Sequence, residues 1–167
     1  IPCVVACVQR FGIGDGFISA GQDNYWQAVK CGGNGDYHLI VLAPNSVQES
    51  CDMAYEAFEL AEKYRHPVCL LSDGTIGQMM EPVTFPEPRT TLLDWTISGV
   101  KPGEDHKVAT DVTYFEPVQE WNHKYLAKMR KISEEEQRWE SFRVEDADVV
   151  LVAYGISSRV AQEAVTR

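Results

Sequence analysis

The sequence lacks a long hydrophobic segment and is short of basic residues. No apolar run in its 167 residues approaches the roughly 20 residues of a transmembrane helix. The first residues also lack the pattern of a signal peptide, a basic region followed by a long apolar stretch. We therefore expect a soluble, cytoplasmic protein without a membrane partner. Lys and Arg number 15 against 25 Asp and Glu, which gives a net charge of −10. Such a chain repels phosphate backbones, which argues against nucleic acid as a partner.

Patterns typical of metal sites are also missing. The five cysteines include no C-x-x-C pair, and no two of the four histidines have the spacing of metal ligands. The sequence therefore predicts neither an iron–sulfur cluster nor another metal site in this chain. We expect the cysteines to be free, buried thiols of a reducing compartment.

The composition is that of a globular protein, with 44% hydrophobic and 24% charged residues. Three nearly continuous apolar runs are typical of strands that are buried on both faces of a parallel sheet: residues 3–8, 37–43 and 67–72. Two helical patterns separate them, at residues 19–30 and 46–65, and Ser46 with Glu49 forms a capping box at the start of the second. This alternation predicts an α/β fold with a parallel sheet.

The second half of the sequence is organised differently. Prolines and charges in residues 81–111 predict an extended connector, and a narrow apolar stripe predicts a helix over residues 118–142. This helix packs either on its own chain or on another domain or subunit. Residues 147–154 then have the pattern of a further strand, and an amphipathic helix follows. One strand and one helix cannot bury the apolar faces of both elements. We expect a piece of a longer protein: residues 1–80 from one domain, 81–145 as linker and long helix, and 146–167 as the start of a second α/β domain.

The loop after the first predicted strand is the best candidate for a binding site. Gln9 and Arg10 end that strand, and glycines 12, 14 and 16 follow. Ligands of open α/β sheets bind at the carboxyl ends of the strands, and a guanidinium group pairs with a carboxylate through two hydrogen bonds. We therefore expect Arg10 to meet an anionic substrate; the alternative is a surface arginine at a strand end. By contrast, the sequence around Asp73 predicts a turn that ends a strand rather than a metal site.

Five segments in order carry a resemblance to a known family: VVACVQR with the glycine-rich loop, GQDNYWQA, GDYHLIVLAPNSVQE, EKYRHPVCLLSDGTIGQMMEPV and VEDADVVLVAYGISSRVAQEAV. Together they resemble the α-type chain of the 2-oxoacid:ferredoxin oxidoreductases, in particular the 2-oxoisovalerate branch. The last segment resembles the opening of that chain's next domain. The resemblance covers nearly the whole sequence and rests on the order and spacing of the segments, not on one motif.

The resemblance implies the pyrimidine-binding portion of a thiamine diphosphate-binding fold. The enzyme would oxidatively decarboxylate a 2-oxo acid, such as 2-oxoisovalerate, to an acyl-CoA and pass the electrons to ferredoxin. Thiamine diphosphate and Mg²⁺ would be shared with a diphosphate-binding partner subunit, and iron–sulfur clusters would lie only in partner subunits. The fragment alone is expected to be inactive. Two alternatives stay open: a thiamine diphosphate enzyme of the transketolase or 2-oxoacid dehydrogenase type, and a non-catalytic α/β interaction module.

The resemblance also implies site residues. The family's arginine that meets the carboxylate of the 2-oxo acid falls on Arg10, and Gln9 and Gly12 beside it are further candidates for substrate binding. Gln22 and Asp23 are candidates for contact with the cofactor.

No catalytic residue is expected within this sequence. The family's glutamate that bonds the aminopyrimidine ring is expected upstream of Ile1, and helix capping is sufficient to explain Glu49. Phe11 and Ile13 stand where relatives usually carry Gly and Pro, which leaves the preferred size of the substrate open.

Overall fold

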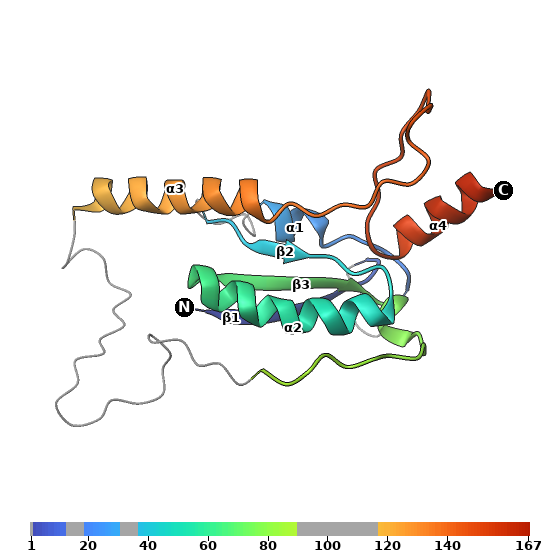
Figure 1. Ribbon diagram of the computed structural model, residues 1–167, viewed down its shortest axis with the longest axis horizontal. Helices are drawn as coiled ribbons and strands as arrows, with labels where there is room; N and C mark the ends of the chain where they lie inside the picture. Colours follow the sequence, from blue (N-terminus) through green and yellow to red (C-terminus); the bar gives the residue numbers. More distant parts are fainter. Residues whose placement is uncertain (1, 13–18, 31–36, 90–116) are drawn as a thin grey trace.

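The computed structural model describes residues 2–12, 19–30, 37–89 and 117–167. Within these residues, three parallel strands form one sheet in the order β1-β3-β2: β1 (Cys3–Gln9), β2 (Ile40–Leu42) and β3 (Pro67–Asp73) (Figure 1). The pairing of β1 with β3 runs from Cys3 opposite Pro67 to Gln9 opposite Asp73. The predicted parallel α/β sheet is confirmed.

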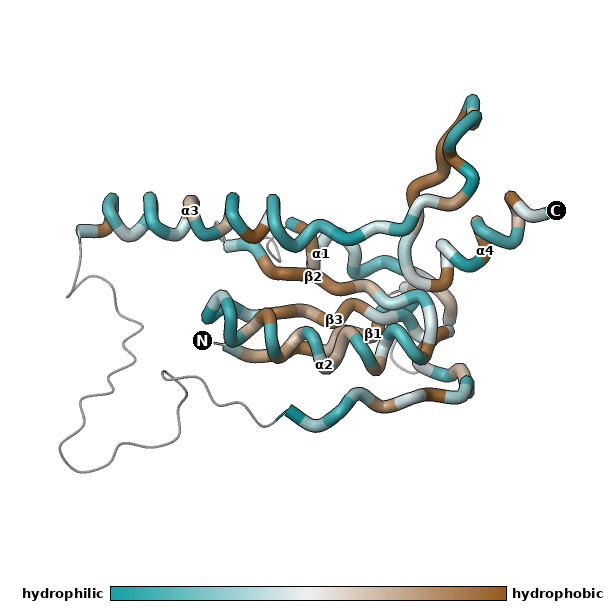
Figure 2. Tube along the Cα trace, viewed as in Figure 1, coloured by the Kyte–Doolittle hydropathy of each residue, from teal (hydrophilic) through white to brown (hydrophobic). Residues whose placement is uncertain are grey.

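Side chains of β3 alternate between two apolar clusters, one on each face of the sheet. Val68 belongs to the cluster beneath α2 (Val47–Tyr64), together with Ala57 and Leu60 of that helix. Cys69 and Leu71 point to the opposite face and pack against α1 (Tyr25–Val29). Colouring by hydropathy shows apolar residues along the strands and a larger share of polar residues on α2 and α3 (Val118–Glu135) (Figure 2). The central strand is therefore buried on both faces, as its continuous apolar sequence predicts.

The α2 helix forms as its sequence predicts. The Ser46 hydroxyl accepts a hydrogen bond from Glu49 N at 3.0 Å, which satisfies one of the free amides of the first turn. The Glu49 carboxylate accepts from Asn45 N at 2.7 Å, one residue before the amide that a standard capping box uses. The helix ends at Arg65, which adopts the left-handed conformation with φ of 46°. Capping therefore accounts for the role of Glu49.

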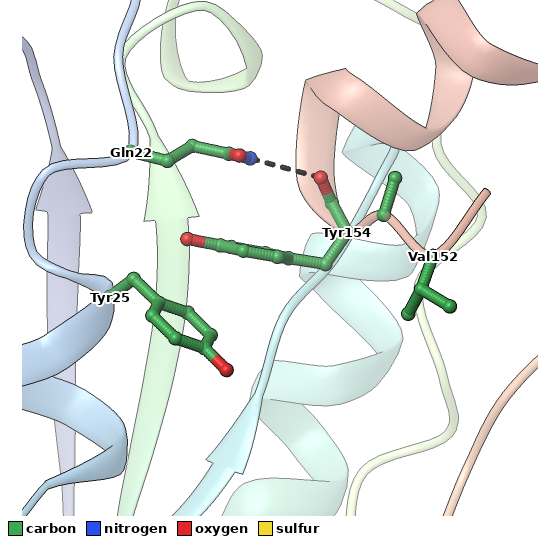
Figure 3. Close-up of a pocket in the computed structure, with 5 residues that line it drawn as sticks. Gln22, Tyr25, Val152 and Tyr154 are labelled. Carbon is green, nitrogen blue, oxygen red and sulfur yellow. Dashed lines mark hydrogen bonds between the residues drawn. The ribbon is translucent and has the colours of Figure 1, made fainter.

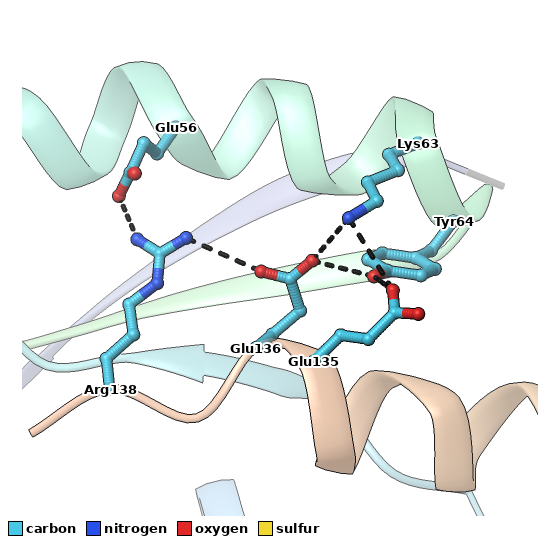
Figure 4. Close-up of polar contacts among 6 residues, drawn as sticks. All are labelled: Glu56, Lys63, Tyr64, Glu135, Glu136 and Arg138. Carbon is cyan, nitrogen blue, oxygen red and sulfur yellow. Dashed lines mark hydrogen bonds and ion pairs between the residues drawn. The ribbon is translucent and has the colours of Figure 1, made fainter.

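The second long helix, α3 (Val118–Glu135), packs on its own chain through its C-terminal half. Ile132 is buried in the cluster beneath α2, and Met129 packs against that cluster. At the end of α3, the Glu136 carboxylate accepts hydrogen bonds from Lys63 Nζ at 2.7 Å and from the Tyr64 hydroxyl at 2.6 Å (Figure 4). The sequence left open whether this helix packs on its own chain or on another domain or subunit. Its C-terminal half packs on its own chain.

Several predicted elements are shorter in the structure. The helical pattern at residues 19–30 yields only α1, and the strand pattern at 37–43 yields only β2, because β2 pairs with β3 over three residues. The predicted helix 118–142 ends at Glu135, where Glu136 turns toward α2. Of the four cysteines in the described part, only Cys69 is buried.

The strand predicted at residues 147–154 is wrong, because the structure forms no strand there. The side chains of residues 149–152 are exposed, from 57% for Val150 to 97% for Val152. No neighbouring strand in the described part of the chain offers hydrogen bonds to this segment, and a periodic pattern cannot supply such a partner. The segment leads directly into α4 (Gly155–Thr166). The assignment of residues 146–167 to a second domain stays a prediction.

Two predicted features lie outside the described residues: the loop around Gly14 and Gly16, and the second part of the connector. Where the structure does describe the chain, no helix is both long enough and apolar enough to cross a membrane.

Candidate functional site

The polar groups of the candidate site meet at the carboxyl ends of β1 and β3. These two ends are held together by a backbone hydrogen bond of 2.8 Å from Gly74 N to Gln9 O. The segment that starts α4 lies against the same edge of the sheet (Figure 1). Three parts of the chain that are far apart in sequence therefore build one site.

Gln9 is fully buried at the end of β1, and its side-chain amide has a partner on each side. Its Nε2 donates to Ser72 O of β3 at 3.3 Å. Its Oε1 accepts from the Tyr154 hydroxyl at 3.0 Å. A buried amide is stable only when its donor and acceptor are both satisfied, so these two bonds fix the orientation of the amide.

Arg10 is the first residue after β1 and is half-buried. The chain then turns through Gly12, whose φ of 78° is a left-handed conformation that favours glycine. Gly12 N donates to the Asp23 carboxylate at 2.9 Å, which joins the two ends of the predicted binding loop. Phe11 N donates to Ser19 O at 3.2 Å and closes the same loop.

Gln22 connects this loop to the start of α4. Its Nε2 donates to Tyr154 O at 2.9 Å, and its Oε1 accepts from the Ser157 hydroxyl at 3.0 Å. Gln9 and Gln22, two residues that the sequence analysis selected for different roles, therefore share Tyr154 as a partner.

An open pocket of about 360 Å³ lies beside Gln22. The rings of Tyr25 and Tyr154 line it and pack against each other, with centroids 5.8 Å apart, and Val152 lies on the far side of Tyr154 (Figure 3). Burial raises the pKa of the Tyr154 hydroxyl, so this group remains a protonated donor at neutral pH. The pocket therefore combines aromatic walls with one side-chain amide.

Asp73, at the end of β3, is buried and accepts three backbone hydrogen bonds. Its Oδ1 accepts from Thr75 N at 3.0 Å and Ile76 N at 2.9 Å. Its Oδ2 accepts from Ile156 N at 2.9 Å, in the first turn of α4. Asp73 therefore forms the predicted strand-ending turn, and it also caps a second element.

A salt bridge joins α4 to the segment after β3. Arg159 of α4 contacts the Glu81 carboxylate at 2.8 Å, and Glu81 also accepts from Val47 N at the start of α2. The hydrogen bond from Arg159 and that from Val47 lower the pKa of the Glu81 carboxyl. Glu81 therefore holds the N-terminal part of α4 near that of α2.

The structure brings all five predicted site residues to one end of the sheet, and it links two of them through Tyr154, which was not predicted as a site residue. Gly12 and Asp23 contact each other directly, whereas Gln9 and Gln22 are linked by Tyr154. Tyr154 was expected at the end of a strand in another domain. Gly155, directly after Tyr154, was the feature of the sequence that could have indicated this contact. A glycine at the end of an apolar run often marks an unusual backbone conformation or a close approach of another segment.

No group of three or more His, Cys, Asp or Glu side chains that could hold a metal ion occurs in the described residues. The polar atoms at the carboxyl edge are instead amides, hydroxyls and the carboxylates of Asp23 and Asp73, both of which accept backbone hydrogen bonds.

A parallel sheet with converging polar side chains at its carboxyl edge defines an α/β ligand-binding domain. Residues 1–147 match the family described as pyruvate flavodoxin/ferredoxin oxidoreductase, thiamine diphosphate-binding, and the chain belongs to this family.

Among its relatives, the chain is 47% identical to ketoisovalerate oxidoreductase subunit VorB of Methanothermobacter marburgensis, over 99% of this chain and 48% of the relative. The VorB subunit of Methanothermobacter thermautotrophicus is 46% identical, with the same coverage. The 2-oxoglutarate synthase subunit KorA of Methanocaldococcus jannaschii is 33% identical, over 98% of this chain and 52% of the relative. The chain therefore spans about half the length of these curated relatives.

Proposed function

We propose that this chain is part of a subunit of a thiamine diphosphate-dependent 2-oxoacid:ferredoxin oxidoreductase. The enzyme oxidatively decarboxylates a branched 2-oxo acid, of the 2-oxoisovalerate type, to an acyl-CoA, and ferredoxin accepts the electrons. The observation that carries this proposal is the 47% identity, along nearly the whole chain, to a ketoisovalerate oxidoreductase subunit. The position of Arg10 at the carboxyl edge of the sheet supports the same function.

Arg10 binds the carboxylate of the 2-oxo acid in this proposal. A guanidinium group has a planar pair of donors that matches the two oxygens of a carboxylate, which a lysine ammonium cannot reproduce. Gln9 and Gly12 set the direction and the curvature of the backbone on either side of Arg10. Arg10 thereby offers a local positive charge to an anionic substrate, whose binding a net charge of −10 would otherwise disfavour.

The residues at the carboxyl edge fit one part of thiamine diphosphate. The aromatic surface of Tyr25 and Tyr154, with the Gln22 amide on the other side of Tyr154, suits a flat heteroaromatic ring with hydrogen-bonding atoms. The described residues offer no comparable cluster of ligands for Mg²⁺. We therefore propose that Gln22 and Asp23, with the loop that Asp23 closes, lie toward the ring portion. A partner subunit holds the diphosphate and Mg²⁺.

When bound, thiamine diphosphate supplies the electron sink that loss of CO₂ from a 2-oxo acid requires. This chain contributes binding and orientation. The aromatic walls exclude water on one side, and Arg10 fixes the acid end of the substrate. The iron–sulfur clusters belong to partner subunits, and the fragment alone should be inactive because it contains only one side of the site.

The test uses the complete chain assembled with its partner subunits. Reduction of a low-potential dye is followed with 2-oxo acids of different sizes, with and without thiamine diphosphate and CoA. Removing the guanidinium in Arg10→Ala should lower kcat/KM by about 100-fold, because charge-assisted hydrogen bonds are lost. Arg10→Lys should retain part of the activity. Arg130→Ala removes an exposed arginine of α3 and serves as the matched control.

The outcomes separate the alternatives. Activity that requires thiamine diphosphate and CoA but not a low-potential acceptor would point to an enzyme of the 2-oxoacid dehydrogenase type. If no 2-oxo acid reduces the dye under any condition, the chain is better described as an interaction module. Full activity in Arg10→Ala would exclude Arg10 from carboxylate binding.

A further inference from the structure

The hydroxyl group of Tyr154 contacts the buried side chain of Gln9, the residue directly before Arg10. It donates to Gln9 Oε1 at 3.0 Å across 145 positions of the chain. The opposite side of the Gln9 amide donates to Ser72 O, so its oxygen is directed toward Tyr154. With Gln9 fully buried, water does not replace a lost partner.

Tyr154 is itself held in place from several directions. Its carbonyl accepts from Gln22 Nε2 at 2.9 Å, and its ring packs against Tyr25 and the apolar cluster of Cys69 and Leu71 (Figure 3). The next residue, Gly155, lies so close to Gln22 and to the end of β3 that a side chain would not fit. The position of the Tyr154 hydroxyl is therefore fixed by the structure around it.

We propose that Tyr154 is a positioning residue for 2-oxo acid binding: through its bond to Gln9, it sets the direction in which Arg10 leaves β1. This inference rests on the proposed function of Arg10. Arg10 directly follows Gln9, and the chain turns sharply at Gly12 two residues later. The Gln9 side chain is thus an anchor immediately before the proposed carboxylate-binding group.

The Gln9 amide should lose its fixed orientation when the hydroxyl is removed. Its buried oxygen then lacks a partner, and a backbone or side-chain adjustment that satisfies this oxygen would displace Arg10. Tyr154 acts through Gln9 and not on the substrate, so the effect should fall on substrate affinity. Loss of a contact that is made equally in the ground state and the transition state raises KM and leaves kcat unchanged.

The first test compares Tyr154→Phe with wild type in the complete enzyme complex. We expect the KM for the 2-oxo acid to rise about fivefold to tenfold, while kcat stays within about twofold. The KM for CoA should not change. Tyr55→Phe, which removes the same hydroxyl from the middle of α2, is the matched control and should behave as wild type. Thermal unfolding of each complex verifies that the assembly is intact.

A double-mutant cycle distinguishes positioning from a general structural role. Gln9→Met keeps a side chain of similar length but removes the amide group and with it both hydrogen bonds, to Ser72 and to Tyr154. If Tyr154 acts through Gln9, adding Tyr154→Phe to Gln9→Met should raise the KM for the 2-oxo acid no further. Independent structural effects would instead multiply.

Failure of this inference can be told apart from failure of the proposed function. An active wild type that is impaired by Arg10→Ala but not by Tyr154→Phe would overturn the positioning role alone. Multiplicative effects in the cycle would also overturn it, as would an equal loss of kcat for every substrate. A wild-type complex without activity toward any 2-oxo acid would overturn the proposed function, and the inference with it.

Discussion

The Asp73 carboxylate accepts a hydrogen bond from the Ile156 amide at 2.9 Å, and this contact ties the end of β3 to the first turn of α4. Its other oxygen accepts from two amides of the turn that follows β3. A negative charge is favourable at a helix N-terminus, where free amides point outward. One buried side chain therefore ends a strand and starts a helix 83 positions away.

Gly155→Ala should separate these two elements. Gly155 has φ of 57°, and a Cβ atom there would lie 2.8 Å from Asp73 Oδ2 and 2.9 Å from Gln22 Nε2. Backbone strain and the clash together should lower the free energy of unfolding by about 1–3 kcal/mol. Denaturant unfolding of the 167-residue chain measures this loss.

The control for this prediction is Gly77→Ala. A Cβ atom at Gly77 meets only Val8 Cγ1, at an ordinary contact distance of 3.6 Å. Its effect should therefore stay within about 0.5 kcal/mol. Equal stabilities of the two variants would contradict the close packing of Gly155.

Elements with strong local signals could be predicted from the sequence. Ser46 was predicted to cap a helix and the apolar run of β3 to form a buried parallel strand. Both predictions depend on residues that are close together in the sequence, and the structure confirms both. Arg10 could be placed at the carboxyl edge for the same reason, since the end of a strand is readable from composition. Local chemistry was sufficient in these cases.

The contacts of Tyr154 could not be predicted in this way. The valine-rich run before it predicts a strand, but a strand requires a neighbour that local sequence does not identify. The bond between Tyr154 and Gln9 joins opposite ends of the chain, and no spacing rule connects them. The positions of the predicted site residues at the carboxyl edge could thus be inferred from the sequence, whereas the hydrogen-bond network that links them could not; their roles stay predictions.

Glu136→Gln should destabilise the contact between α2 and α3 in a pH-dependent way. Hydrogen bonds from Lys63 and Tyr64 lower the pKa of the Glu136 carboxyl below its ordinary value of 4.5. A carboxyl with a lowered pKa in the folded state contributes stability above the ordinary pKa, and this contribution is lost as pH falls through the folded-state pKa. We expect a loss of about 1–2 kcal/mol at pH 7.

Denaturant unfolding of wild type and Glu136→Gln between pH 7 and pH 3 tests this expectation. The difference in stability should be constant near neutrality and shrink once the pH is below 4.5. Glu140→Gln, at an exposed carboxylate after α3, is the control and should change the stability at pH 7 by less than about 0.5 kcal/mol. A difference that persists unchanged at pH 3 would show that Glu136 contributes through packing rather than through its charge.

His66 should titrate below its ordinary pKa of 6.5. Burial at the amino end of β3 lowers the pKa of this imidazole, and Lys128 Nζ, 3.5 Å from Nδ1, lowers it further; the hydrogen bond to His38 O opposes both. The unfolded chain therefore takes up its proton first, and stability should decrease as pH falls through 6.5.

An NMR titration of the His66 imidazole measures the midpoint directly. Lys128→Met should raise that midpoint, whereas Lys131→Met, which removes an exposed lysine one turn along α3, should leave it unchanged. A wild-type midpoint at or above 6.5 would contradict the burial of His66 in this environment.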